Sequence, residues 1–171
     1  MGVAVLSSRD SSNYFFADQA HVLSQGQSQS VTLTIADPTK PIRIALAWTD
    51  RASGTTTHAY ENLQNDLDLQ VRATGSDGIQ RTWYGNLFYV NRDDLSRREF
   101  SLRDPSPVDY DRRNNVEKVA IASLGQPNGL VAGMTTITVT VTAWGLTGDG
   151  LDPTGSTSRQ DFALAVENAR Q

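Results

Sequence analysis

Two carboxylates in the segment Asn65 to Val71, NDLDLQV, have a spacing that could support chemistry. Leucines alternate strictly with Asp66 and Asp68, and this pattern predicts a half-buried β-strand, because successive side chains on a strand point to opposite faces. The two acids then project from the same face, about 7 Å apart. Carboxylates that close repel each other unless a cation neutralises them. We call Asp66 and Asp68 the acid pair and expect a metal ion or a basic side chain beside it.

Calcium is the metal that suits these residues best, because Ca²⁺ takes about six to eight oxygen ligands from carboxylates, carbonyls and water. Further oxygen donors lie at the end of the preceding predicted strand and in a dense group after residue 110. The hypothesis is one Ca²⁺ site assembled by strand pairing, since the sequence contains no EF-hand loop. The competing hypothesis is that Arg72, Arg81 or Arg113 neutralises the acids across strands. The predicted metal ligands are Asp50, Asp66, Asp68, Asp111, Asn114, Asn115 and Glu117.

The sequence shows no catalytic constellation. Its two histidines, His21 and His58, lie in no motif, and Gly-x-Ser-x-Gly, His-Gly-Thr and Gly-Thr-Ser-Met are all missing. A nucleophilic serine needs a base that a third group orients, and two scattered histidines without cysteine do not make a zinc site. A glycosidase pair usually faces across a cleft, whereas the acid pair shares one strand. We therefore predict no catalytic residue and no enzymatic activity for this chain alone.

Aromatic residues offer an alternative function, a carbohydrate-binding or other ligand-binding module. Trp48 has the same parity as Ile44 and Leu46, so we expect it in the core. Trp144 falls on the threonine parity of its strand, and we expect it to be exposed. Exposed aromatic rings are the side chains on which sugars stack, so Trp144 is the residue that would carry this alternative.

Alternating segments recur along the chain, whereas no segment carries a 3.6-residue apolar stripe. Turn signals rich in Gly, Pro, Asn and Asp separate them. About eight short strands of this kind predict an all-β fold, an antiparallel β-sandwich or jelly roll. The expected core residues are Leu33, Ile44, Leu46, Trp48, Leu67, Leu69, Val139, Val141, Phe162 and Leu164.

Length and composition narrow the class of protein further. A chain of 171 residues suits one β-sandwich domain, with residues 1–20 as a linker or edge segment and residues 87–113 as a long loop insertion. The net charge of −4 and the absence of a basic run argue against nucleic acid as a partner. No apolar stretch is long enough to cross a membrane. The lack of cysteine excludes disulfides and thiolate metal ligands.

Six blocks stand out along the sequence: LAWTD (46–50), NDLDLQV (65–71), YGN (84–86), DRRNNVEKVAI (111–121), ITVTVTAW (137–144) and QDFALAVEN (160–168). In this order and at this approximate spacing, they resemble the region that follows the catalytic domain in large bacterial subtilisin-like serine proteases of the S8 family. The resemblance covers roughly residues 20–169. The chain departs from that pattern in residues 51–60, which lack the expected prolines, and in the longer segment 87–113.

This resemblance implies a jelly-roll β-sandwich, similar to galactose-binding-like domains and to the P domain of proprotein convertases. It implies a non-catalytic accessory role: stabilising an upstream subtilisin-like catalytic domain, or helping it to engage a protein substrate. The Asp-His-Ser triad would lie in that catalytic domain, outside this chain, and the protein would be secreted. Because several members of the family bind calcium in this domain, the resemblance also favours calcium over arginine at the acid pair.

Overall fold

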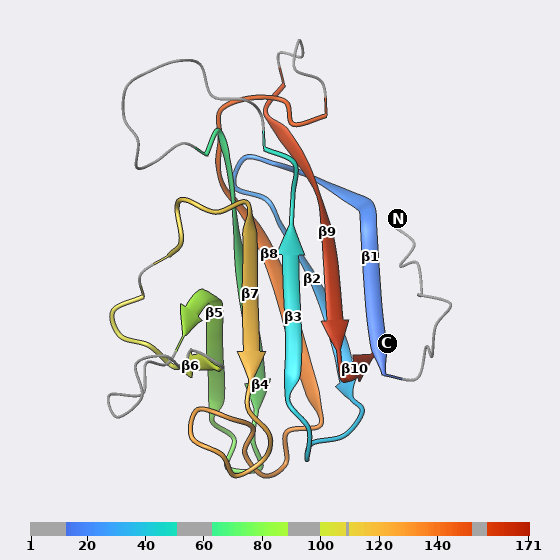
Figure 1. The fold of residues 1–171 in the computed structure, drawn as a ribbon, viewed down its shortest axis with the longest axis vertical. Coiled ribbons are helices and arrows are strands. Elements are labelled where there is room, and N and C mark those ends of the chain that lie inside the picture. Colours follow the sequence, from blue (N-terminus) through green and yellow to red (C-terminus); the bar gives the residue numbers. More distant parts are fainter. Residues whose placement is uncertain (1–12, 51–62, 89–99, 109, 152–156) are drawn as a thin grey trace.

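Ten β-strands in two sheets make up the computed structural model, which describes residues 13–50, 63–88, 100–108, 110–151 and 157–171. The sheets lie face to face as two layers (Figure 1). The first sheet contains, in spatial order, β1 (Tyr14–Ser24), β9 (Arg159–Glu167), β3 (Ile42–Ala47) and β7 (Val116–Ile121). The second contains β10 (Ala169–Arg170), β2 (Ser28–Ile35), β8 (Thr136–Leu146), β4 (Asn65–Thr74), β5 (Gln80–Phe88) and β6 (Ser101–Arg103).

The strand order is that of a jelly roll. Every pair of neighbouring strands is antiparallel, and most consecutive strands alternate between the two sheets. Without the two shortest strands, the orders are β1-β9-β3-β7 and β2-β8-β4-β5, as in an eight-stranded double-sheet roll. The prediction of an all-β antiparallel sandwich is confirmed, and the described residues contain no helix and therefore no helical membrane span.

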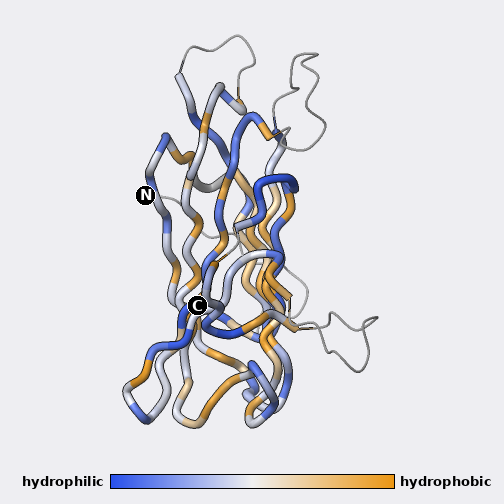
Figure 2. Tube along the Cα trace, turned by 90° about the vertical axis from the view of Figure 1, so that its left-hand side faces the viewer, coloured by the Kyte–Doolittle hydropathy of each residue, from blue (hydrophilic) through white to orange (hydrophobic). Residues whose placement is uncertain are grey.

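The hydrophobic core lies between the two sheets and follows from the alternation of the sequence. Figure 2 shows the sheets from the side, with hydrophobic and hydrophilic residues alternating along the strands. All ten predicted core residues are buried, and Trp83 and Leu130 join them. On the acid-pair strand, Leu67 and Leu69 point into this core, so the acid pair must face outward from β4.

Two segments were expected to lie outside the main strands: residues 1–20, as a linker or edge segment, and residues 87–113, as a long loop insertion. Both include strand residues. β1 begins at Tyr14 and forms an edge of the four-stranded sheet by pairing with β9. The segment 87–113 includes β6 and Arg112, which contacts the acid pair, while residues 89–99 and 109 lie outside the described part of the chain.

Candidate functional site

The cation beside the acid pair is Arg112. Its Nη1 lies 2.5 Å from Asp66 Oδ2 and 2.7 Å from Asp68 Oδ1, so one guanidinium bridges both carboxylates. The two acids are each 7% exposed, and burial raises the pKa of both, although Arg112 acts in the opposite direction. Asp66 Oδ1 is buried without a hydrogen-bond partner among the described residues. The arginine hypothesis was correct in kind, but wrong in naming Arg72, Arg81 or Arg113 as the cation.

Aromatic rings hold the Arg112 side chain from two sides. The guanidinium carbon lies 4.9 Å from the ring centroid of Tyr110 and 4.6 Å from that of Trp144. Tyr110 in turn meets Tyr84 edge to face, with the ring centroids 5.5 Å apart. Cation–π contacts of this kind add to the two ion pairs and fix the position of the guanidinium. Trp144 is exposed, as its parity predicted.

Glu117 lies on β7 close to the acid pair, points towards the interior of the sandwich and is 1% exposed. β5 pairs with β4 only from Gln70 to Thr74, which leaves the edge of the earlier half of β4 uncovered. There the Leu69 N–H donates to Glu117 Oε2 at 2.5 Å. Burial raises the pKa of Glu117 to about 9, and the nearby charges of the acid pair and Asp111 add to this effect. Glu117 is therefore a neutral acid at neutral pH, which limits it as a metal ligand.

Gly85 makes room for the Glu117 side chain. A Cβ atom at this position would lie within 3 Å of the Glu117 carboxyl group. The next residue, Asn86, has a positive φ of 55° and donates from Nδ2 to Val116 O at 2.8 Å. Its Oδ1 accepts the Lys118 N–H at 2.9 Å, so one side-chain amide covers the edge of β7.

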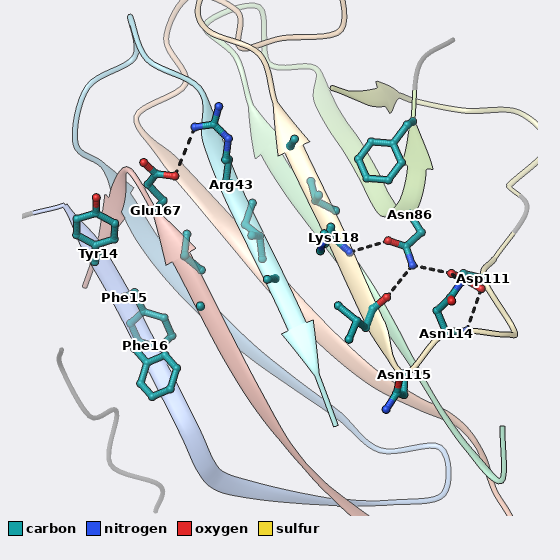
Figure 3. Close-up of a pocket in the computed structure, with 18 residues that line it drawn as sticks. Tyr14, Phe15, Phe16, Arg43, Asn86, Asp111, Asn114, Asn115, Lys118 and Glu167 are labelled. Carbon is teal, nitrogen blue, oxygen red and sulfur yellow. Dashed lines mark hydrogen bonds and ion pairs between the residues drawn. The ribbon is translucent and has the colours of Figure 1, made fainter. Parts of the chain in front are cut away.

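Asp111 and Asn114 form a second polar group beside Asn86, shown in Figure 3. Asp111 Oδ2 accepts the side-chain amides of Asn86 at 2.6 Å and Asn114 at 2.7 Å, and Oδ1 accepts the Arg113 N–H at 2.9 Å. Burial acts to raise the pKa of Asp111, but these donors hold it below the usual value. Both carboxylate oxygens are thus already used within the protein.

Asp50 and Asn115 belong to a third group at the end of the sandwich where β3 finishes and β4 begins. Asp50 Oδ1 accepts the Asn65 N–H at 2.8 Å. Trp48 Nε1 donates to Asn65 O at 2.8 Å, and Asn115 Nδ2 donates to Trp48 O at 2.9 Å. These bonds tie the start of β4 to the residues around the end of β3 and the start of β7.

Asn65 is the centre of that third group and is 0% exposed. Its Nδ2 donates to Gln160 Oε1 at 2.8 Å and to Gly148 O at 3.1 Å. Its Oδ1 accepts N–H groups from Thr147 at 3.1 Å and from Gly148 at 3.2 Å. Gln160, also 0% exposed, donates from Nε2 to Thr49 O at 3.1 Å. All four hydrogen-bonding positions of the Asn65 amide are therefore satisfied.

The seven predicted metal ligands thus fall into three neighbouring groups with different partners. The acid pair binds Arg112, Glu117 accepts a backbone N–H beside it, and Asp111 with Asn114 binds Asn86. Asp50 and Asn115 serve the network around Asn65. Within the described ranges, no group of three or more His, Cys, Asp or Glu residues has the arrangement of a metal site. Both histidine side chains, His21 and His58, lie outside what the structure describes.

Sequence reasoning missed the residues that organise these groups, namely Arg112, Asn65, Gln160 and Asn86. Asn65, Gln160 and Asn86 are uncharged amides, and no spacing rule marks an amide as a buried hub. For Arg112 a signal was present: it lies between Tyr110 and the Asn-rich segment, as a cation with an aromatic neighbour two residues away. Choosing it over Arg113 required the direction in which each side chain points.

An open groove of about 1420 Å³ lies on the outer face of the four-stranded sheet. Figure 3 shows Tyr14 and Phe16 at one side and Asn86 with Asp111 at the other. Its lining includes Ala45, Ala120 and Ala165, together with the charged residues Arg43, Lys118 and Glu167. We call Arg112, the acid pair, Tyr110 and Trp144 the arginine cluster. None of these residues lines the groove, so the groove and the arginine cluster are separate features of the surface.

Comparisons with known protein families and with curated proteins identified no relative of this chain. No protein-family model matches the chain, and no curated protein matches it with statistical significance.

Proposed function

We propose that this chain is a non-catalytic accessory domain of a secreted subtilisin-like serine protease and that it stabilises the catalytic domain. The observation that supports the proposal most is the convergence of five of the six sequence blocks. Residues of LAWTD, NDLDLQV, DRRNNVEKVAI and QDFALAVEN meet around the Asn65 amide, while YGN meets DRRNNVEKVAI at β7. These blocks are therefore determinants of one architecture, which is what a shared accessory fold would retain.

The surface proposed for the catalytic domain is the outer face of the four-stranded sheet. Its middle carries alanines, and Tyr14, which is 41% exposed, stands at its edge. The outer face of the other sheet is polar, with serine and threonine hydroxyls that bond one another. A groove with apolar side chains in its middle suits burial against a neighbouring domain better than a hydroxyl-covered face.

We expect an arginine at Ala165 to remove the stabilising effect in the intact protease. Ala165 is exposed on that face, so the larger charged side chain should block contact without disturbing the core. The measurement is the half-time of thermal inactivation of the protease with the native domain, with Ala165→Arg, and with the domain deleted. Ala165→Arg should shorten the half-time nearly as far as deletion. Ser30→Arg, on the opposite face, should leave it within about twofold; equal half-times for all forms would contradict the proposal.

Calcium remains part of the proposal, and its fit to the acid pair is partial. The buried, unpartnered Asp66 Oδ1 is an oxygen that a hard cation could take. The Arg112 guanidinium, however, already occupies the position between the two carboxylates. We propose that Ca²⁺ would be held by the acid pair and would compete with Arg112 for it.

We expect calcium to raise the melting temperature of the chain relative to a chelator, and to raise that of Arg112→Ala by more. An ion that binds only the folded state contributes about 2.7 kcal/mol at a hundredfold excess over its dissociation constant. For a domain of this size that corresponds to roughly 5–10 °C. Arg113→Ala, an exposed neighbour, is the control and should behave like the native chain. If Arg112→Ala melts identically in calcium and in chelator, the acid pair is not a calcium site.

A further inference from the structure

Trp144 lies on the outer face of the six-stranded sheet. Its contact with Arg112 leaves much of the indole ring accessible to solvent. Its side chain is 60% exposed, whereas the other two tryptophans of the chain, Trp48 and Trp83, are 5% and 0% exposed. A tryptophan ring offers a large flat apolar surface, and this residue type dominates the energetics of binding sites. The question is which ligand the surroundings of this ring suit.

Trp144 points outward on the same parity as the threonines of β8, and it lies at a β-bulge. On β4, Leu67 pairs with Ala143, whereas the residue before it pairs with Gly145. Trp144, which lies between these two partners on β8, is therefore an extra residue without a partner on β4. Bulges are common beside binding and active sites, where they change the direction of a side chain. The ring thus stands on the outer face at a position that has no paired residue on β4.

The ring is also held in place before any ligand arrives. Arg112 packs 4.6 Å from its centroid, and the acid pair fixes the guanidinium by two ion pairs. Gln25 Nε2 donates to the Trp144 carbonyl oxygen at 2.5 Å, which holds the backbone of this residue. A side chain that is already ordered loses little rotamer entropy when a ligand stacks on it.

Hydroxyl groups extend from Trp144 along β8 and the neighbouring β2. They form three cross-strand pairs at 2.8, 2.8 and 3.2 Å, and we call them the hydroxyl rows. Each hydroxyl can donate one hydrogen bond and accept others, so the rows can meet either kind of partner. From Trp144 they run about 20 Å along the strand. The pairs are Ser28 with Thr142, Ser30 with Thr140, and Thr32 with Thr138.

We propose that Trp144 and the hydroxyl rows form a binding platform for a neutral oligosaccharide. A sugar ring carries an apolar C–H face that can stack on the indole and a rim of hydroxyls that can bond the rows. Arg112 is already matched by two carboxylates, whereas Arg72 and Arg170 are exposed cations that lie at the far end of the rows, beside Thr138 and Thr34. A protein interface would instead place several apolar side chains around the ring. This binding role is additional to the accessory role and can be tested on the chain by itself.

The test is a fluorescence titration of the 171-residue chain with cellohexaose, chitohexaose, mannohexaose and xylohexaose, with polygalacturonate as the anionic probe. Because Trp48 and Trp83 are buried, a ligand over Trp144 should shift the emission and protect the accessible tryptophan from iodide quenching. At least one neutral hexasaccharide should bind. Trp144→Ala should weaken that binding at least about tenfold, the loss expected when an aromatic anchor is removed. Isothermal titration calorimetry measures the affinity of this variant, whose fluorescence signal is lost.

Two controls separate stacking from non-specific effects. Ile79→Ala removes a side chain that is 57% exposed in a turn away from the platform, and it should leave the affinity unchanged. Thr140→Val keeps the shape of a residue in the hydroxyl rows but removes its hydroxyl, and it should weaken binding by a smaller factor than Trp144→Ala. The proposal is overturned if no neutral hexasaccharide binds, if only polygalacturonate binds, or if Trp144→Ala binds as tightly as the native chain.

Discussion

Replacing Asn65 by alanine should lower the free energy of unfolding by on the order of 3–5 kcal/mol. The change removes an amide that is 0% exposed, and the buried groups that lose it as a hydrogen-bond partner are Gln160 Oε1, the Gly148 carbonyl and the Gly148 N–H. Each unsatisfied buried group costs about 1–3 kcal/mol. For a domain of this size, the total corresponds to a decrease in melting temperature of roughly 10 °C. Thermal and urea unfolding followed by circular dichroism measure it.

Gln70→Ala is the matched control for this prediction. Gln70 is also an amide on β4, but it is only half-buried and outside the network around Asn65. Its truncation should change stability by no more than about 0.5 kcal/mol. Similar losses for the two variants would show that the Asn65 amide does not organise this end of the sandwich.

Glu117→Gln should stabilise the protein at alkaline pH and have little effect in acid. The folded-state pKa of about 9 lies above the ordinary value of 4.5, so the folded protein binds a proton that the unfolded chain releases. Native stability should therefore be highest below the unfolded pKa and fall as the pH rises towards the folded pKa. A glutamine retains the acceptor for the Leu69 N–H but does not titrate. Near pH 8 the variant should be more stable than the native chain by a few kcal/mol.

The readout is the difference in unfolding free energy between the two proteins at about pH 5, 7 and 9, the range that Glu117 spans. The acid pair and Asp111 titrate near Glu117 in both proteins, so their contribution largely cancels in the difference. Glu167→Gln is the control, because Glu167 is half-exposed in an ion pair with Arg43. A difference that does not change with pH would mean that Glu117 is ionised in the folded protein.

Alternation along the strands was sufficient to predict the sandwich and its core. Leu67 and Leu69 could be assigned to the inner face because a strand has a fixed period of two, and burial follows directly from that period. The bulge at Trp144 interrupts the alternation of β8. The exposure of this residue was still predicted correctly, because the alternation holds up to Trp144 and changes only after it.

Contacts between loops and strands could not be predicted in the same way. Arg112 reaches the acid pair from a segment more than forty residues away in sequence, and nothing in local periodicity fixes where that segment lies. The acids were recognised because like charges at close spacing require a cation. Which cation is present depends on tertiary packing, here on the two rings that hold the guanidinium. The neutral state of Glu117 depends on burial in the same way.

The central claim, that this chain is an accessory domain of a subtilisin-like serine protease, is tested most directly by the sequence encoded upstream in the same reading frame. The account predicts a subtilisin-like catalytic domain there, with a histidine in a His-Gly-Thr motif and a serine in a Gly-Thr-Ser-Met motif. A reading frame that starts at this domain, or that continues upstream into a domain without those motifs, would contradict the claim.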